Sequence, residues 1–127
     1  WAVSPRVRLA QVNMALEHFI GKYNDHADRF VLAGDFNDFS RRWNSLLLGL
    51  CNKYPLRDFF VNEKHELSYL LRDYHFFEPS SNLRTVSPCG FHLDHIFVRG
   101  ANALSYDSCN ERFGSDHHPV IIKLHVE

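Results

Sequence analysis

The amino-acid sequence predicts an α+β fold and a single domain unit over residues 1–127. Helical periodicity appears near the start, and three strand-like segments close the chain. This order of elements is typical of mixed folds in which helices and sheet are segregated along the chain. The composition, with 45% hydrophobic residues, 23% charged residues and a net charge of −1, is that of a globular protein rather than a disordered one.

The first third of the chain predicts one helix and one strand. Apolar residues recur at helical spacing from about Pro5 to Ile20, and Ser4 can cap this helix. Gly21 is expected to stop the helix. The unbroken apolar run from Phe30 to Ala33 then predicts a short strand that is buried on both faces.

The middle of the chain is harder to interpret than its ends. A second helix is expected from Ser40 to about Asn52, because leucines and a tryptophan fall on one face. Within the region from Lys53 to Asn82, Leu56–Val61 is compatible with a strand, and Glu66–Tyr74 with a short helix or an irregular loop. The three strands expected near the C-terminus are His92–Val98, Ala103–Ser108 and Pro119–Val126.

Charge and cysteine content limit the classes of protein to consider. The near-neutral charge gives no whole-chain electrostatic signature of nucleic-acid binding. A phosphate substrate is still compatible with it, because a bound divalent cation supplies positive charge locally. The three cysteines lack CxxC spacing, which favours a reducing compartment such as the cytoplasm over a disulfide framework. No apolar run is long enough to cross a bilayer, so we expect no transmembrane segment.

Polar residues follow the first predicted strand in the stretch GDFN. Asp35 and Asn37 are expected on the same side of the chain, since alternate residues of an extended segment share a face. A carboxylate can hold a divalent cation or orient a water, and an amide can bind a phosphoryl oxygen or that water. Taken alone, the stretch is better explained by an Asx turn at the end of a strand.

Two further strands begin with acidic residues. Asp94 stands at the start of an apolar strand, where it can pair with a histidine and fix its tautomer. Asp116 and His117 precede the last strand, and because neighbours in sequence point different ways, one can ligate a metal while the other acts on substrate. Three acid-bearing strand ends in one short chain favour a functional site over unrelated surface acids.

Three motifs carry a family resemblance: GDFND, LDHIFVRG and SDHHPVIIKL, in this order, with RTVSP before the second. Together they resemble the endonuclease/exonuclease/phosphatase superfamily. The resemblance implies a DNase I-like fold and a metal-dependent phosphoesterase that uses Mg²⁺ or Mn²⁺. It also implies a phosphate-ester substrate, with nucleic acid, phospholipid headgroups, inositol phosphates and small phosphodiesters as the options, so an endonuclease is among the expected activities.

The resemblance also implies a role for each residue of the three motifs. Asp35 would orient or activate the attacking water near the metal, and Asn37 would bind the phosphate or that water. Asp116 would be a metal ligand, together with Asp35. His117 would contact the scissile phosphate, either stabilising its developing charge or acting as general base, and Asp94 would hold His117 in orientation.

The resemblance covers the C-terminal half of a larger fold. Members of the superfamily usually form a four-layer α/β sandwich, in which a mixed or antiparallel sheet is flanked by helices. Their N-terminal half supplies an asparagine, the principal metal-binding glutamate and another histidine, and no residues of this chain match these three. We therefore expect the chain alone to be weakly active or inactive, and to need that half as a partner.

Two other interpretations remain open. One is a truncated or degenerate module of the same fold that acts in binding without catalysis. The presence at strand ends of all five polar residues argues against it: Asp35, Asn37, Asp94, Asp116 and His117. The other is a transition-metal site built on histidines beside Asp94 and Asp116. Its candidate ligands are His92, His95, His117 and His118. Adjacent histidines on a strand point apart, which argues against this arrangement.

Overall fold

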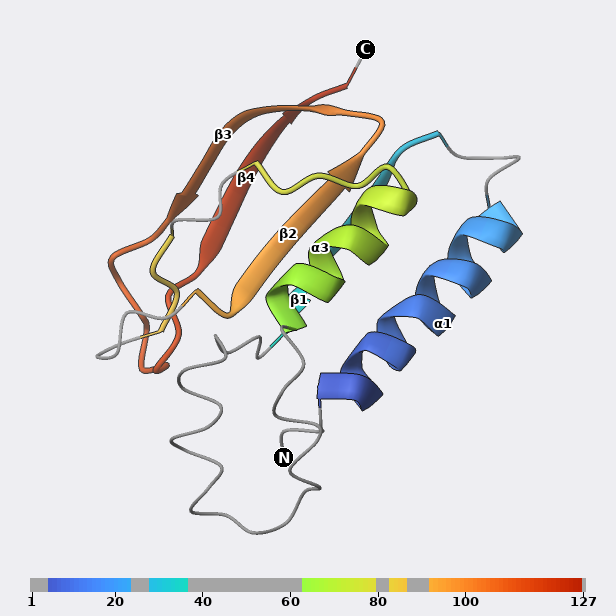
Figure 1. The fold of residues 1–127 in the computed structure, drawn as a ribbon. Helices are drawn as coiled ribbons and strands as arrows, with labels where there is room; N and C mark the ends of the chain where they lie inside the picture. Colours follow the sequence, from blue (N-terminus) through green and yellow to red (C-terminus); the bar gives the residue numbers. More distant parts are fainter. Residues whose placement is uncertain (1–4, 24–27, 37–62, 80–82, 87–91, 127) are drawn as a thin grey trace, which may run out of the picture. The chain divides into compact units, whose positions relative to one another are not determined.

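A computed structural model describes residues 5–23, 28–36, 63–79, 83–86 and 92–126. These residues form two helices and four strands (Figure 1), which confirms the α+β class. They belong to two compact parts, one with the helices and the other with the strands. None of the described helices is long and apolar enough to cross a membrane. The elements are α1 (Pro5–Tyr23), β1 (Phe30–Asp35), α3 (Glu63–Asp73), β2 (Asp94–Arg99), β3 (Asn102–Ser108) and β4 (Val120–His125).

Helix α1 begins where predicted and ends three residues later than predicted. It continues through Gly21 to Tyr23, so the expectation that Gly21 stops the helix is wrong. One glycine costs a helix only about 1 kcal/mol relative to alanine. Contacts across this turn favour its continuation: the Phe19 and Tyr23 rings stack with centroids 6.4 Å apart, and the basic Lys22 lies at the negative end of the helix dipole.

Helix α3 decides between the two interpretations of Glu66–Tyr74 in favour of a helix. Leu67 and Leu71 are four residues apart and both buried, and α3 packs against α1 in the helical part. The helix ends at Asp73, and His75 follows with a left-handed φ of 62°, a conformation that commonly closes helices. The expected helix at Ser40–Asn52 and the expected strand at Leu56–Val61 lie outside the described residues.

The C-terminal strands are confirmed to within two residues at each end. The strand near Phe30 is also present, but the prediction that it is buried on both faces is wrong: Val31 is 56% exposed, and only Phe30 and Leu32 are partly covered. Side chains alternate between the two faces of a strand, and an unbroken apolar run does not show that both faces are covered.

The strands form two antiparallel pairs, β1 with β2 and β3 with β4 (Figure 1). In the first pair, the register places Asp35 directly opposite Asp94. In the second pair, the register shifts between Ala103 and Ser105, an irregularity of the kind that bends a strand. Strand β2 is the most buried of the four, and Val98 is fully buried.

Strand β2 has its amides satisfied on both edges. One edge pairs with β1, and the amides of alternate residues on the other edge meet three separate acceptors. Asp94 N donates to the Thr85 hydroxyl (3.1 Å), Ile96 N to the Tyr106 phenol oxygen (3.3 Å) and Val98 N to the Phe77 carbonyl (2.8 Å). Burial, with the nearby charge of Glu78, raises the pKa of Tyr106 to about 12, so its phenol stays neutral over the physiological range.

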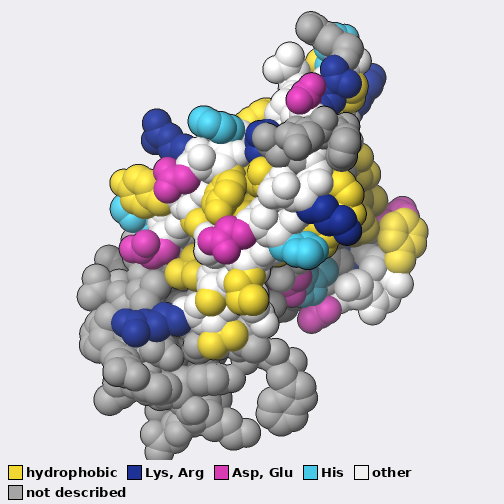
Figure 2. All heavy atoms as spheres, turned by 90° about the vertical axis from the view of Figure 1, so that its right-hand side faces the viewer, with side chains coloured by type: hydrophobic (Ala, Val, Ile, Leu, Met, Phe, Trp, Pro, Cys, Tyr) yellow, Lys and Arg dark blue, Asp and Glu magenta, His cyan; other side chains and the backbone are white. Residues whose placement is uncertain are grey.

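Several large apolar side chains of the strands remain exposed. Val31, Leu104 and Ile121 are each more than half exposed. Figure 2 shows one face of the molecule, where hydrophobic side chains are mixed with acidic, basic and histidine side chains. The described residues on this face therefore form no charged surface of a single sign.

Candidate functional site

The first component of the site is a pair of carboxylates on neighbouring strands. Asp35 ends β1 and Asp94 begins β2, and the two residues face each other in the antiparallel register. Because the Phe36 amide donates to the Leu93 carbonyl (2.8 Å) at the next position, Asp35 and Asp94 form a non-hydrogen-bonded pair. Side chains approach most closely in such pairs, with Cβ atoms about 4.5–5.5 Å apart, so two negative charges meet at this corner of the sheet.

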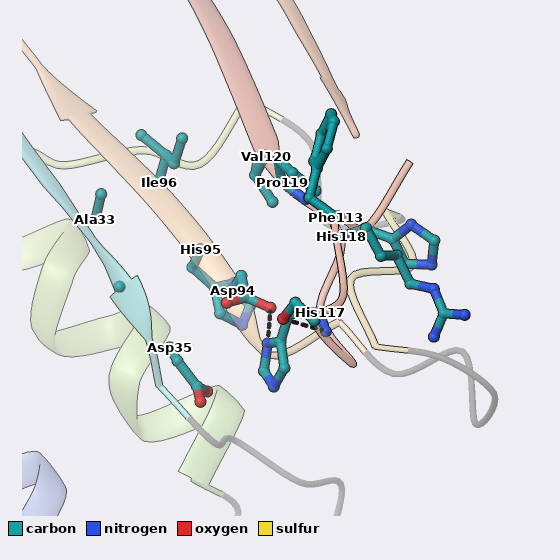
Figure 3. A pocket seen from close by; sticks show the side chains of 13 residues that line it. Ala33, Asp35, Asp94, His95, Ile96, Phe113, His117, His118, Pro119 and Val120 are labelled. Atoms are coloured by element: carbon teal, nitrogen blue, oxygen red, sulfur yellow. Dashed lines mark hydrogen bonds and ion pairs between the residues drawn. The ribbon is translucent and has the colours of Figure 1, made fainter. Parts of the chain in front are cut away.

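The second component is a histidine hydrogen-bonded to one of these carboxylates. His117 Nδ1 lies 2.7 Å from Asp94 Oδ2, across a separation of 23 residues in sequence (Figure 3). Their side chains are 29% and 24% exposed, so the pair is accessible from solvent. When Nδ1–H donates to Asp94, the other ring nitrogen, Nε2, is turned away from the carboxylate and is available to a ligand.

A short loop before β4 positions the His117 ring. The backbone amide of His117 donates to the Ser115 hydroxyl (3.0 Å), and His117 also forms an isolated β-bridge with Val86. The next residue, His118, donates its amide to the Thr85 carbonyl (2.7 Å), and its Nδ1 lies 3.0 Å from the Cys109 carbonyl oxygen. His118 therefore supports the loop, while His117 presents its ring to the pocket.

Thr85 joins the two halves of the site. It is fully buried, and its hydroxyl accepts hydrogen bonds from the amides of Leu93 (2.9 Å) and Asp94 (3.1 Å). Its carbonyl accepts from the amide of His118. One residue thus fixes both the start of β2, which carries Asp94, and the loop that carries His117.

The carboxylates around His117 determine its protonation. The hydrogen bond to Asp94 raises the pKa of His117 above its usual value, and partial burial opposes this rise. The negative charges of Asp94, Asp35 and Asp116 raise the pKa further. The protonated ring is therefore a larger fraction of the population near neutral pH than for a histidine in water.

The two opposed carboxylates and His117 line an open pocket of about 520 Å³ (Figure 3), a volume in the range of small-molecule sites. Its wall includes Asp35, Asp94 and His117, together with Arg112 and Phe113 from the loop between β3 and β4. An arginine in the wall can bind a phosphate in bidentate fashion. The pocket thus combines two carboxylates, an imidazole and a guanidinium.

The oxygen ligands at this corner fit a hard divalent cation such as Mg²⁺. Mg²⁺ is commonly held by one or two carboxylates while it keeps several waters, and the opposed pair of Asp35 and Asp94 supplies two carboxylates. A cation between them would also relieve their mutual repulsion. Asp116 is exposed, is not part of the pocket wall, and acts on His117 through its charge.

The structure brings together most of the residues that the sequence singled out. Asp35, Asp94 and His117 share one pocket, and Asp116 adjoins it. Asn37 lies outside the described residues. The catalytic and metal-binding roles of these residues remain predictions.

Sequence reasoning missed three residues that the structure brings to this region: Thr85, Arg112 and Glu78. Thr85 lies in the RTVSP stretch, but a buried hydroxyl and an exposed one look alike in a sequence.

The histidines are not arranged as the transition-metal interpretation proposed. His117 bonds to Asp94 and His118 to a backbone carbonyl. His92 and His95 do lie together, but with Glu78, which sequence reasoning did not consider as a ligand. This is a second cluster, separate from the Asp94–His117 pair.

Comparison with known proteins identifies one family. The sequence model of the Endonuclease/Exonuclease/phosphatase family matches residues 1–117, a span that includes all three acid-bearing strand ends and stops at His117. No curated protein and no solved structure gives a significant match.

Proposed function

Because the chain belongs to the endonuclease/exonuclease/phosphatase family, whose members are generally metal-dependent hydrolases, we propose that it carries the phosphate-binding and water-orienting side of a Mg²⁺-dependent phosphoesterase site. The observation that supports this most is the hydrogen bond between His117 and Asp94 in a pocket that also holds Asp35 and Arg112. The substrate is a phosphodiester or a phosphomonoester.

Each residue of the pocket has a chemical task in this proposal. A bound Mg²⁺ would supply positive charge that polarises a phosphoryl oxygen. Asp35 and Asp94, in the pocket wall, would hold it, and Asp116, outside the wall, would bind one of its waters. Asp35 accepts a hydrogen bond from the attacking water and orients it. Arg112 binds a second phosphoryl oxygen and keeps the phosphate in the pocket.

His117 acts as a hydrogen-bond donor to the phosphate rather than as a base. In the protonated ring, Nδ1–H donates to Asp94 and Nε2–H is left to donate to a phosphoryl oxygen. This donor stabilises the negative charge that develops on the phosphate as water attacks. Asp94 orients the ring and stabilises its positive charge.

The pH dependence of turnover separates this role from that of a general base. If His117 donates, kcat/KM falls as the pH rises through the pKa of His117, because the donor proton is lost. If His117 were a base, kcat/KM would fall as the pH drops through the same pKa. Inactivity below this pKa would therefore overturn the donor role while leaving the phosphoesterase proposal intact.

We further propose that the chain forms part of a DNase I-like four-layer sandwich and that full turnover needs the ligands of the family's N-terminal half. The exposed Val31, Leu104 and Ile121 on the strands support this, since a covering layer would bury them. The alternative function is binding without catalysis by the same fold.

Turnover of a chromogenic phosphodiester tests the proposal. It is measured with Mg²⁺ for this chain alone and for the chain mixed with any segment encoded upstream of it, and a phosphomonoester is compared under the same conditions. The expected result is little turnover by the chain alone and strong turnover by the mixture, reduced about 10²- to 10⁴-fold by His117→Ala.

A matched control is His65→Ala, which changes an exposed histidine on α3 and should leave turnover unchanged. Turnover that survives His117→Ala would contradict the assigned site. A mixture whose parts associate but stay inactive on both substrates would favour the binding module.

A further inference from the structure

A second group of polar side chains lies on β2 and in the segment before it. Glu78, His92 and His95 each offer one ligand atom, and these three atoms lie within 4.8 Å of one another. We propose that they form a zinc site that stabilises the strand part of the protein and is distinct from the Asp94–His117 pair.

The three donors converge on a small volume. His95 Nδ1 lies 2.7 Å from Glu78 Oε1, and His92 Nε2 lies 3.5 Å from the same oxygen. In a tetrahedral zinc site with metal–ligand distances near 2.1 Å, neighbouring donor atoms are roughly 3.4 Å apart. These two separations lie on either side of this value, and the third, between the two histidine nitrogens, is at most 4.8 Å, so changes of about 1.4 Å or less would make room for the ion.

The chemistry of the donors suits zinc better than Mg²⁺. Two imidazole nitrogens and one carboxylate oxygen form a ligand set typical of zinc, with a fourth position left for a water. Mg²⁺ prefers oxygen ligands, which the Asp35 and Asp94 pair supplies instead. The two clusters therefore select different metals.

Burial distinguishes this cluster from chance proximity of surface side chains. The side chains of His95, His92 and Glu78 are only 2%, 8% and 13% exposed. The surroundings are aromatic: the His95 ring stacks on Phe97 with centroids 5.6 Å apart, and Phe36 meets both rings edge-on. A carboxylate is costly to bury among such groups unless it is paired or bound to a metal.

The two histidine rings of the cluster lie close together. Their centroids lie 4.2 Å apart with a tilt of 33°. The surrounding rings hold His95 in place, which reduces the entropy lost on binding an ion. Packing thus preorganises the cluster before any metal arrives.

The position of the cluster links β2 to the segments that precede it. His95 and Asp94 are neighbours on β2, so their side chains point to opposite faces of the strand. Both residues line the pocket, but Asp94 bonds to His117, while the side chain of His95 is 2% exposed and bonds to Glu78. A zinc ion there would tie Glu78 and His92, from the segments preceding β2, to the strand itself.

Zinc content tests the site directly. The full chain is loaded with Zn²⁺, dialysed at neutral pH, and analysed for bound metal and for the visible absorption of tetrahedral Co²⁺ after exchange. We expect one tightly bound ion per chain and a higher Tm with zinc than with EDTA. We expect His92→Gln and Glu78→Gln each to weaken zinc affinity by more than about 100-fold, since each removes a ligand.

Two control variants test whether zinc binds at the Glu78, His92 and His95 cluster. His117→Gln alters the phosphate pocket and His65→Gln alters an exposed helix residue, and both should retain one zinc per chain. Wild-type protein without stoichiometric zinc, or undiminished zinc in both ligand variants, would overturn the proposal. If a ligand variant fails to fold, Co²⁺ absorption of the wild type decides alone: a tetrahedral band with nitrogen ligands supports the site, and its absence refutes it.

Discussion

Gly100 lies against the backbone of Asp28, so closely that a Cβ atom at Gly100 would collide with the Asp28 carbonyl oxygen. Gly100 also has φ of +73°, a conformation that side chains rarely adopt. Gly100 follows β2 at the turn into β3, and Asp28 precedes β1. The close approach of the segments next to β1 and β2 therefore requires a residue without a side chain at position 100.

Gly100→Ala is therefore expected to destabilise the protein by at least about 2 kcal/mol, through backbone strain and steric clash together. Gly114→Ala is the matched control, because Gly114 has φ of +89° but open space around its Cβ position. It should cost only the strain, about 1 kcal/mol. Urea denaturation of both variants measures the difference; equal losses would show that the contact with Asp28 is unimportant.

Because the pKa of His117 is raised in the folded protein, the free energy of unfolding is expected to depend on pH. Because the folded-state pKa lies above the unfolded value of about 6.5, the interaction with Asp94 stabilises the fold fully below about pH 6.5 and is lost as the pH rises through the folded pKa. The groups that face His117 are Asp94, Asp35 and Asp116, and all three act in the same direction.

Asp94→Asn in metal-free protein tests this dependence. The substitution should lower the pKa of His117, measured by NMR titration of its ring protons, and the stability gap between wild type and variant should narrow as the pH rises. Asp107→Asn changes an exposed carboxylate on β3 and should leave the His117 titration unchanged. An unaltered His117 pKa in Asp94→Asn would show that the hydrogen bond does not control its protonation.

The Thr85 hydroxyl is expected to be needed for both folding and site geometry. Thr85→Val keeps the shape of the side chain but leaves the amides of Leu93 and Asp94 without their acceptor, which should cost about 2 kcal/mol. Thr85→Ser keeps the acceptor and should lose much less. Thermal denaturation compares the two variants, and similar Tm values for both would mean that packing of the methyl group matters more than the hydroxyl.

The outcome along the chain shows which features a single sequence can predict. The C-terminal strands were predictable because turn residues bound each apolar segment, and α1 because apolar residues repeat at helical spacing. The end of α1 was not predictable, because the contacts of Phe19 and Lys22 around Gly21 outweigh the weak tendency of glycine to end a helix. The exposure of Val31 was not either, because burial of a strand face depends on what packs against it.

The same limit applies to the site. Motifs pointed to Asp35, Asp94 and His117, because each adjoins an apolar strand. Their mutual placement follows from the register of β1 against β2 and from Thr85, which no local pattern encodes. Glu78 is separated from His95 by 17 residues and belongs to no spacing motif, so only the fold reveals the cluster that they form with His92.

Asp35 and Asp94 should make the stability of the protein responsive to Mg²⁺. A cation bound between opposed carboxylates stabilises the folded state by about 1.4 kcal/mol when its concentration is ten times its Kd. Asp35→Asn removes one of these charges, so the rise in Tm on adding Mg²⁺ should be much smaller in this variant than in wild type. Asp73→Asn, at the exposed end of α3, should respond like wild type.

The experiment is run on zinc-loaded protein, so that any occupancy of the Glu78 cluster is constant and the Mg²⁺ response reports on the Asp35 corner alone. An equal Mg²⁺ response in Asp35→Asn and wild type would place the cation elsewhere. A wild-type Tm that does not change on adding Mg²⁺ would mean that two opposed carboxylates do not hold the ion by themselves. Metal binding would then depend on ligands from the family's N-terminal half.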